Sequence, residues 1–149
     1  MRAVLQRVSR ASVSVAGETV GEIGKGILVL LGVSVKDIEA DAVYVLEKIV
    51  NLRIFDGADG KMNESLLDVK GEMLVVSQFT LFGDSRRGRR PSYIDAARPE
   101  DANELYEFFV TEARKKIGKV KTGRFQTMME VELINDGPVT LLIDSEKAF

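Results

Sequence analysis

The sequence predicts an α+β fold with a mainly antiparallel, barrel-like β-sheet and two principal helices packed on it. Strand patterns separated by short turns occupy both ends of the chain, and two segments carry apolar residues at helical spacing. The order is strands, helix, strand, helix, strands, with no linker, repeat or low-complexity stretch, which favours helices layered on a sheet. With 149 residues, 45% of them hydrophobic, we expect residues 1–149 to form a single domain.

The strands at the start of the chain are predicted from alternation. Polar and apolar side chains alternate over residues 2–8 and again over 11–15, and residues 18–23 follow a turn at Ala16-Gly17. The run Ile27–Leu31 is continuously apolar, which is typical of a strand covered on both faces. We therefore expect this run to lie inside the sheet.

Two helices are predicted. The first spans about residues 37–52, where apolar side chains recur at helical spacing and Asp37 is a suitable N-cap. The second begins near Pro99, because proline is tolerated in the first turn, and closes at the basic run 114–116 followed by Gly118.

The remaining segments are short strands and turns. Residues 53–55 are predicted to be a short strand, and the acidic loop 56–60 is expected to be a plain turn, since it lacks the later bidentate glutamate of a calcium loop. A long strand is expected over residues 72–82. Two further strands, 128–134 and 139–144, close the chain.

The chain contains no histidine and no cysteine. This excludes Ser-His-Asp and Cys-His catalysis, zinc sites of the Cys/His type and disulfides. We predict no metal and no cofactor. No apolar run is long enough to cross a bilayer and the first residues alternate, so we expect neither a membrane span nor a signal peptide, and a cytoplasmic location.

Two segments are candidates for chemistry. Ser77-Gln78-Phe79-Thr80 places two hydroxyls and an amide at the expected end of a buried strand, and alternation would put Gln78 and Thr80 on one side. The alternative is that this is only the polar end of a strand. Asn135-Asp136-Gly137-Pro138 has the composition of a turn between two strands, and base rates favour a trans bond between Gly137 and Pro138.

The loop between residues 83 and 97 contains a local basic patch. Arg86, Arg87, Arg89 and Arg90 could offer planar donors to phosphate groups, while the formal net charge of the whole chain is −2. A solvated loop tip is the alternative. Any nucleic-acid binding must therefore use this patch rather than overall charge.

Taken together, these motifs resemble the D-aminoacyl-tRNA deacylases. The resemblance rests on the opening residues 1–8 and on 77–81, 88–92, 122–125 and 135–140, which match in order across the whole chain. One departure is Gln126-Thr127-Met128, where small residues and an aspartate often stand in the family. This departure affects the pocket wall rather than the reaction.

The resemblance implies hydrolysis of the ester between a D-amino acid and the terminal adenosine of tRNA, with glycyl-tRNA as a second candidate substrate. It also implies a homodimer in which each active site contains residues of both subunits. The expected partner is tRNA, bound through its aminoacylated 3′ end. A catalytically inert tRNA-binding module is the competing hypothesis. A metal-independent esterase of small molecules is a third.

The resemblance also implies roles for individual residues. Ser77, Gln78, Phe79 and Thr80 would line the ester pocket, with backbone N–H groups near Phe79 and Thr80 forming an oxyanion hole. Chiral selection would fall to a cis Gly137–Pro138 turn inserted into the partner's site, together with Asn135, and Arg7 would brace that turn. The attack would come either from the Thr80 hydroxyl or from water activated by the ribose 2′-hydroxyl, and we favour the second.

Overall fold

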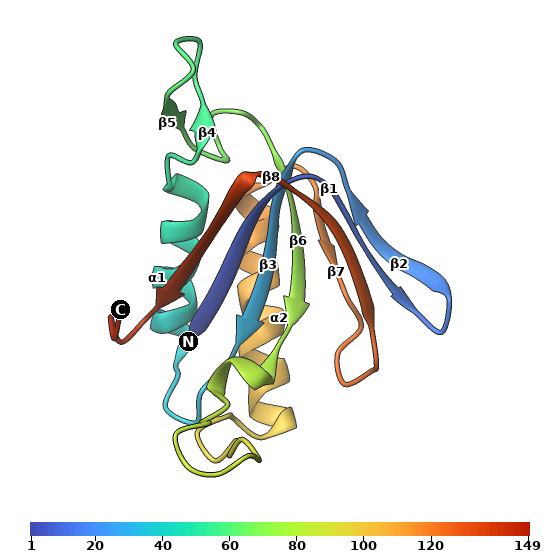
Figure 1. The fold of residues 1–149 in the computed structure, drawn as a ribbon, viewed down its shortest axis with the longest axis vertical. Coiled ribbons are helices and arrows are strands. Elements are labelled where there is room, and N and C mark those ends of the chain that lie inside the picture. Colours follow the sequence, from blue (N-terminus) through green and yellow to red (C-terminus); the bar gives the residue numbers. More distant parts are fainter.

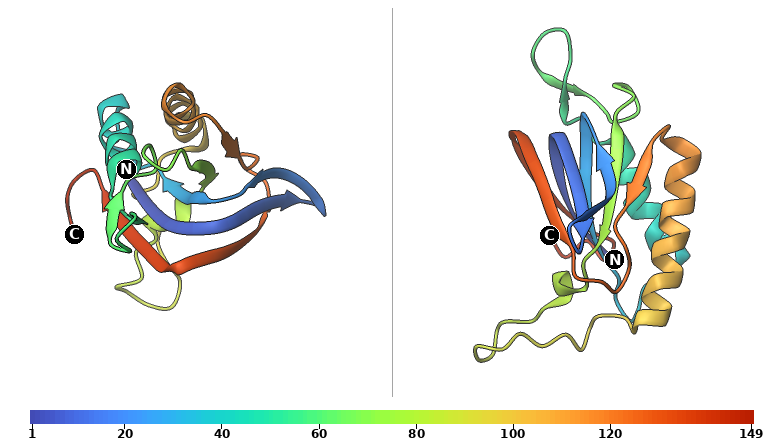
Figure 2. Two further views of the ribbon diagram at one scale, coloured as in Figure 1. Left: turned by 90° about the horizontal axis from the view of Figure 1, so that it is seen from above. Right: turned by 90° about the vertical axis from the view of Figure 1, so that its right-hand side faces the viewer.

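The computed structural model describes residues 1–149 and consists of a strongly curved mixed sheet with two helices covering one of its faces (Figures 1 and 2). The predicted α+β class is confirmed. In chain order, the elements are β1 (Arg2–Val15), β2 (Glu18–Ile23), β3 (Gly26–Gly32), α1 (Glu39–Asn51), β4 (Phe55–Asp56), β5 (Met62–Glu64), β6 (Glu72–Ser77), the short 3-10 helix η1 (Phe79–Phe82), α2 (Pro99–Lys116), β7 (Val120–Thr122) and β8 (Glu130–Asp144).

The long strand β1 organises the sheet. It pairs antiparallel with β2, β3 and β8, whereas the pairs β3–β6 and β6–β7 are parallel. β3 lies between β1 and β6 and is buried on both faces, as the apolar run predicted. The parallel pairs bring the end of β6 beside the end of β3, which is where the cavity described below opens.

Two groups of buried side chains form the core. The larger has 23 buried residues and fills the space between the sheet and the two helices. The smaller lies on the other side of the sheet and comprises Val8, Ala11, Val13, Ile23, Leu28, Leu74 and Val76. Both helices contribute to the larger group through the apolar side chains predicted from helical spacing, because these side chains face the sheet.

The first two predicted strands form one element. β1 continues through Ser9 and Arg10, both exposed, and pairs with β8 along most of its length. Register irregularities lie on either side of Val8, so the strand bends there instead of turning back. Alternation is interrupted at the bend, which is why the sequence pattern resembled two strands.

The first helix begins two residues later than predicted, and Asp37 is not its cap. Ile38 is the N-cap residue, and its backbone N–H donates to the Asp41 carboxylate at 3.0 Å. The Asp37 carboxylate instead accepts the Ser34 N–H at 2.6 Å and the α-ammonium of Met1. The Asp37 side chain, which local preference assigns to the helix N-cap, is therefore engaged in a tertiary contact with Met1 instead.

The predicted strand over residues 72–82 ends at Ser77. The N–H of Gln78 still donates to the Leu31 carbonyl at 2.8 Å, but β3 ends at Gly32, so no partner remains for further pairing. The chain then forms η1, closed by bonds from the Leu81 N–H to the Gln78 carbonyl at 3.2 Å and from the Gly83 N–H to the Thr80 carbonyl at 2.9 Å. The prediction that Gln78 and Thr80 share a side of a strand is wrong.

The prediction that residues 135–138 form a turn between two separate strands is also wrong. β8 continues through these residues, and both of its halves pair antiparallel with the same strand, β1. Asn135 lies opposite Val8 and Thr140 opposite Gln6, so the residues between them form a bulge across from Arg7 alone. Residues with the composition of a turn therefore form a bulge, and the pairing of β8 with β1 resumes after it.

Two small differences complete the fold. The strand predicted at residues 53–55 is shifted to β4, which pairs only with β5 in a hairpin that projects from the body (Figure 1). The three-residue strand β7 at the sheet edge was not predicted, because so short a segment carries no alternation signal. No helix is both long and apolar enough to cross a membrane.

Candidate active site

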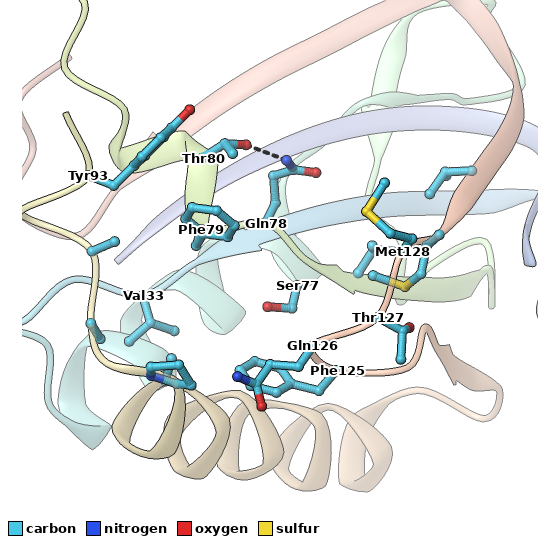
Figure 3. A pocket seen from close by; sticks show the side chains of 17 residues that line it. Val33, Ser77, Gln78, Phe79, Thr80, Tyr93, Phe125, Gln126, Thr127 and Met128 are labelled. Carbon is cyan, nitrogen blue, oxygen red and sulfur yellow. Dashed lines mark hydrogen bonds between the residues drawn. The ribbon is translucent and has the colours of Figure 1, made fainter. Parts of the chain in front are cut away.

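A cavity of about 640 Å³ opens between the end of β6, the start of α2 and the segment before β8 (Figure 3). Its volume lies in the range of sites that enclose small molecules. The lining residues are Val33, Val76, Ser77, Gln78, Phe79, Thr80, Tyr93, Ala96, Ala97, Pro99, Ala102, Phe125, Gln126, Thr127, Met128, Met129 and Val131. No carboxylate, lysine or arginine is among them, so hydroxyls, amides and backbone groups provide the polar chemistry.

The wall made by Ser77–Thr80 is positioned by a close approach between β3 and η1. At Gly32, an added Cβ would lie 3.0 Å from the Gln78 carbonyl oxygen and 3.1 Å from the Leu81 Cβ, so a larger residue would push η1 away. Arg2 fixes the other end of η1, donating to the Leu81 carbonyl at 3.1 Å and lying 4.7 Å above the Phe82 ring.

Two kinds of polar group belong to this wall, side-chain groups and backbone N–H groups. The Gln78 side-chain amide donates a hydrogen bond to the Thr80 hydroxyl oxygen (Figure 3). The N–H groups of Phe79 and Thr80 stand at the start of η1, where the first backbone donors of a helix have no partner within it. No carboxylate or amine contacts the Thr80 hydroxyl, so nothing in the chain withdraws its proton.

Exposed apolar side chains surround the mouth of the cavity. Phe79 is 56% exposed and makes an edge-to-face contact with Tyr93, with ring centroids 5.1 Å apart. Met128 is 91% exposed on the opposite side of the cavity in Figure 3. Such side chains are costly to leave in water, so this rim is suited to covering a bound molecule.

The segment that departs from the family pattern forms the opposite wall. Gln126, Thr127 and Met128 all line the cavity, as the prediction for the pocket wall required. Gln126 has a φ of 56°, a left-handed conformation that a non-glycine residue seldom adopts. The Thr127 hydroxyl donates to the Arg124 carbonyl at 2.8 Å and closes this turn.

The second predicted segment lies elsewhere. No residue of Asn135–Pro138 lines the cavity, and Gly137 and Pro138 are exposed. The bend of β8 lies at the end of the molecule that carries β4 and β5, whereas the loop that follows η1 lies at the opposite end (Figure 1). The peptide bond between Gly137 and Pro138 is cis, the geometry that the family resemblance implied.

The bulge is held by its own side chains and by Arg7. The Asn135 amide oxygen accepts the Val139 N–H at 2.7 Å, and its nitrogen donates to the Thr140 hydroxyl at 2.9 Å. Gly137 has a φ of 142°, and an added Cβ would lie 2.8 Å from Val139 Cγ2. This position therefore requires glycine.

Arg7 is only 7% exposed and occupies an inward-facing position of β1. Its Nε donates to the Asp136 carbonyl at 2.8 Å, and its Nη1 donates to the Ile54 carbonyl at 2.7 Å. Two half-exposed carboxylates lie farther from the guanidinium, that of Asp136 at 3.6 Å and that of Asp56 at 3.7 Å. Arg7 thus ties the bulge of β8 to the base of the β4–β5 hairpin.

The arginines of the basic loop fall into two groups. Arg86 forms a two-pronged pair with Asp84, with both N–O distances 2.8 Å, and hydrogen bonds from Arg86 hold the pKa of Asp84 at about 2. Arg87, Arg89 and Arg90 are exposed and form no ion pair. Arg86 therefore stabilises the loop conformation, and the other three present free guanidiniums.

The structure thus brings together Ser77, Gln78, Phe79 and Thr80 in one cavity but keeps Asn135, Gly137 and Pro138 away from it. Several lining residues were not singled out from the sequence, above all Tyr93 and Met129. An aromatic residue in an otherwise charged loop was a signal for Tyr93. Phe125 lies in the segment 122–125, which carries part of the family resemblance, but no property of the sequence indicates its place in the cavity. No cluster of three or more acidic, histidine or cysteine side chains is placed to hold a metal ion.

Comparisons with known proteins agree on one family. The family model described as D-Tyr-tRNA(Tyr) deacylase matches residues 4–144. The D-aminoacyl-tRNA deacylase of Thermosipho melanesiensis is 62% identical, and that of Fervidobacterium nodosum is 63% identical; each alignment covers 100% of both chains.

Two solved structures share the fold. A c-Myc DNA unwinding element binding protein superposes with a TM-score of 0.92 at 41% identity, over 97% of this chain and 98% of that one. A probable eukaryotic D-amino acid tRNA deacylase gives a TM-score of 0.82 at 18% identity, over 95% and 97%, and supports the fold alone. The whole-length matches place the chain in the D-Tyr-tRNA(Tyr) deacylase family, among the D-aminoacyl-tRNA deacylases.

Proposed function

We propose that the chain carries out the reaction of its family, hydrolysis of D-aminoacyl-tRNA, at the Ser77–Thr80 wall of the cavity. The observation that carries this proposal is a cavity of about 640 Å³ that is lined by the first residues of η1 and contains no charged side chain in its lining. The first backbone N–H groups of a helix are not used within it. Donors of this kind stabilise the oxyanion that forms when water adds to an ester. An aminoacyl ester is already activated, so orientation and oxyanion stabilisation provide a useful rate.

The reaction is balanced without a cofactor. The oxygen of water bonds to the ester carbonyl carbon, the bond between that carbon and the ribose oxygen breaks, and one proton of water passes to the ribose oxygen. The N–H groups of Phe79 and Thr80 would hold the carbonyl oxygen, with Ser77 and Gln78 lining the same wall. The products are free tRNA and a D-amino acid.

We assign activation of the water to the ribose 2′-hydroxyl of the substrate rather than to Thr80. The Thr80 hydroxyl oxygen accepts a hydrogen bond from Gln78, which lowers its electron density, and no base contacts it. Thr80→Ala should therefore retain deacylation within about tenfold of the original rate, an effect the size of one lost polar contact. Loss of activity to the uncatalysed level would instead identify Thr80 as the nucleophile.

For chiral selection, we propose that a second copy of the chain supplies its Gly137–Pro138 turn to the cavity. Both residues are exposed in the single chain, and no residue of its own Asn135–Pro138 segment lines the cavity. Backbone groups of the turn would receive the substrate's α-amino group and leave no room for an L side chain. Asn135 and Arg7 would hold the turn in place. The functional unit would then be a homodimer.

For tRNA binding, we propose contacts between the phosphates near the 3′ end and Arg87, Arg89 and Arg90. The three guanidiniums are free of ion pairs and belong to the loop that also contributes Tyr93 to the cavity. Planar guanidiniums suit phosphate oxygens. Since aminoacyl-tRNA is used in the cytoplasm, we propose that location for the protein.

A tRNA-binding module without catalysis is the second candidate. It is favoured by one observation, the likeness to a protein whose name refers to DNA binding rather than to hydrolysis. Incubation of the purified protein with matched D- and L-aminoacyl-tRNA separates the two candidates. Selective loss of the D ester is expected. Salt-sensitive binding with neither ester cleaved would establish the module, and cleavage of both esters would remove the chiral role of Gly137–Pro138.

A further inference from the structure

A second cavity, of about 390 Å³, adjoins the first. Its lining residues are Pro99, Glu100, Asn103, Phe125 and Gln126, of which Pro99, Phe125 and Gln126 also line the larger cavity. In Figure 3, Phe125 and Gln126 lie between the larger cavity and α2. A ligand that fills the larger cavity can therefore extend into the second one past these shared walls.

The two cavities differ in chemistry. The larger one has no charged lining residue, whereas the second carries the Glu100 carboxylate and the amides of Asn103 and Gln126 beside the Phe125 ring. None of these three polar side chains makes a hydrogen bond or ion pair within the chain. Amide and carboxylate groups next to an aromatic ring are the groups that proteins use to read the edge of an unstacked base and to pack against its face.

We propose that the second cavity holds the base of the nucleotide that precedes the terminal adenosine of the tRNA 3′ end. This inference rests on the proposed function, which places the scissile ester at the Ser77–Thr80 wall of the larger cavity, and it takes the attached adenosine to lie in that cavity as well. The Glu100 carboxylate accepts hydrogen bonds only, so it favours a base with an exocyclic amino group, as in cytosine, over uracil. Asn103 supplies both donors and acceptors to the same edge.

The surrounding charge agrees with a bound nucleotide. Arg98 precedes Pro99 and Arg124 precedes Phe125, and both arginines are exposed and free of ion pairs. A phosphate that joins two nucleotides held in adjoining cavities would lie close to these chain segments. The second cavity thus provides recognition that is independent of the amino acid.

The test uses D-aminoacyl esters of adenosine, of the dinucleotide CpA and of UpA, with amide-linked analogues of the same three compounds for equilibrium binding. We expect the CpA ester to exceed the adenosine ester about tenfold in kcat/KM, and the UpA ester to show little of this gain, as for one well-made base contact. Glu100→Gln and Asn103→Ala should abolish most of the CpA advantage. Glu104→Gln, an exposed position on α2 outside both cavities, is the matched control and should leave all ratios unchanged.

The binding arm keeps this inference separate from the proposed function. If no ester is cleaved but the CpA analogue binds more tightly than the adenosine analogue, the base-binding role of the second cavity is supported and the hydrolysis proposal fails. Equal binding of the three analogues overturns the second cavity. Equal weakening of the adenosine and CpA analogues by Asn103→Ala also overturns it, because the cavity would then hold the terminal adenosine itself.

Discussion

The Ser77–Thr80 wall and the Asn135–Pro138 bulge both interrupt a regular strand, but they are held in different ways. The wall begins at Ser77, the last residue of β6 that pairs with β3, and lines a cavity built from its own chain. The bulge is exposed, yet its backbone is tied by a buried arginine and by the Asn135 side chain. This exposed, firmly held segment does not line the cavity of its own chain, and it is the segment that we propose to enter the cavity of a second copy.

The difference also separates two kinds of selectivity. The wall offers backbone and amide donors, which suit the ester shared by all aminoacyl substrates. The bulge offers a backbone held in one shape, and this is the feature that we propose distinguishes a D- from an L-amino acid. Changes to the bulge should therefore alter stability and the ratio of D- to L-ester cleavage together, whereas changes to the support of the wall should alter stability without changing that ratio.

The largest effect is expected for Arg7→Ala. The substitution removes a buried charge that binds two backbone carbonyls, Asp136 O and Ile54 O, which would be left unpaired. We expect the free energy of unfolding in urea to fall by about 3 kcal/mol. Deacylation of D-aminoacyl-tRNA should fall about 100-fold, because the turn loses its fixed position.

Arg10→Ala is the matched control for this prediction. Arg10 lies on the same strand, but it is exposed and pairs only with the exposed Glu132 at 3.4 Å. A change of less than about 0.5 kcal/mol is expected. If Arg7→Ala behaved like Arg10→Ala in both stability and activity, the distinction between a braced bulge and an ordinary surface turn would be lost.

Gly137→Ala should have the next largest effect. The added Cβ would approach Val139 Cγ2 to 2.8 Å and Arg7 Nη2 to 3.2 Å at a φ of 142°. We expect a loss of about 1–2 kcal/mol in stability and a smaller ratio of D- to L-ester cleavage. Gly60→Ala, with a φ of 74° and open space around it, is the control: it should cost stability but leave the D/L ratio unchanged.

Tyr106→Phe probes the support of the wall. The buried Tyr106 hydroxyl donates to the Val75 carbonyl of β6 at 2.8 Å, so its removal should cost about 1 kcal/mol with deacylation unchanged. Burial raises the pKa of Tyr106 above its ordinary value of 10.0. The folded state thus favours the neutral phenol, and this contribution to stability is lost as pH rises above about 10.

Urea titrations between pH 7 and 11 measure this effect. The original chain should lose more stability over this range than Tyr106→Phe does, so the two stabilities converge as pH rises. A constant difference would show that the hydroxyl is not held as the neutral donor. A loss of activity at pH 7 would show that the strand and the cavity wall are coupled more tightly than the contacts indicate.

The smallest effect is expected in the basic loop. Because the pKa of Asp84 is about 2, its pair with Arg86 is intact at neutral pH. Arg86 is thus engaged by Asp84, whereas Arg89 forms no ion pair. Arg89→Ala should reduce the slope of log Kd for tRNA against log salt by about one, as expected for a lost phosphate contact. Arg86→Ala should change that slope less. The reverse order would assign the phosphate contact to Arg86.

Two segments of the cavity, Ser77–Thr80 and Gln126–Met128, were predictable from the sequence and its family resemblance. The absence of histidine and cysteine limited any catalysis to carboxylates, hydroxyls, lysine, backbone amides or the substrate itself, and the cavity contains neither a carboxylate nor a lysine. Ser77–Thr80 was found as a polar segment that follows a buried strand. Its conformation was not predictable, because β6 ends where its partner β3 ends, and the sequence of β6 does not contain that information.

By itself, the sequence determined the α+β class, the two helices, the buried strand β3 and the family. Periodicity, composition and ordered motifs are local properties that the chain carries without folding. The tertiary structure decided that Asn135–Pro138 is a bulge, that Arg7 is buried beneath it, and that segments from residue 33 to residue 131 share one cavity. These features depend on which strand pairs with which, and pairing is settled only when distant segments meet.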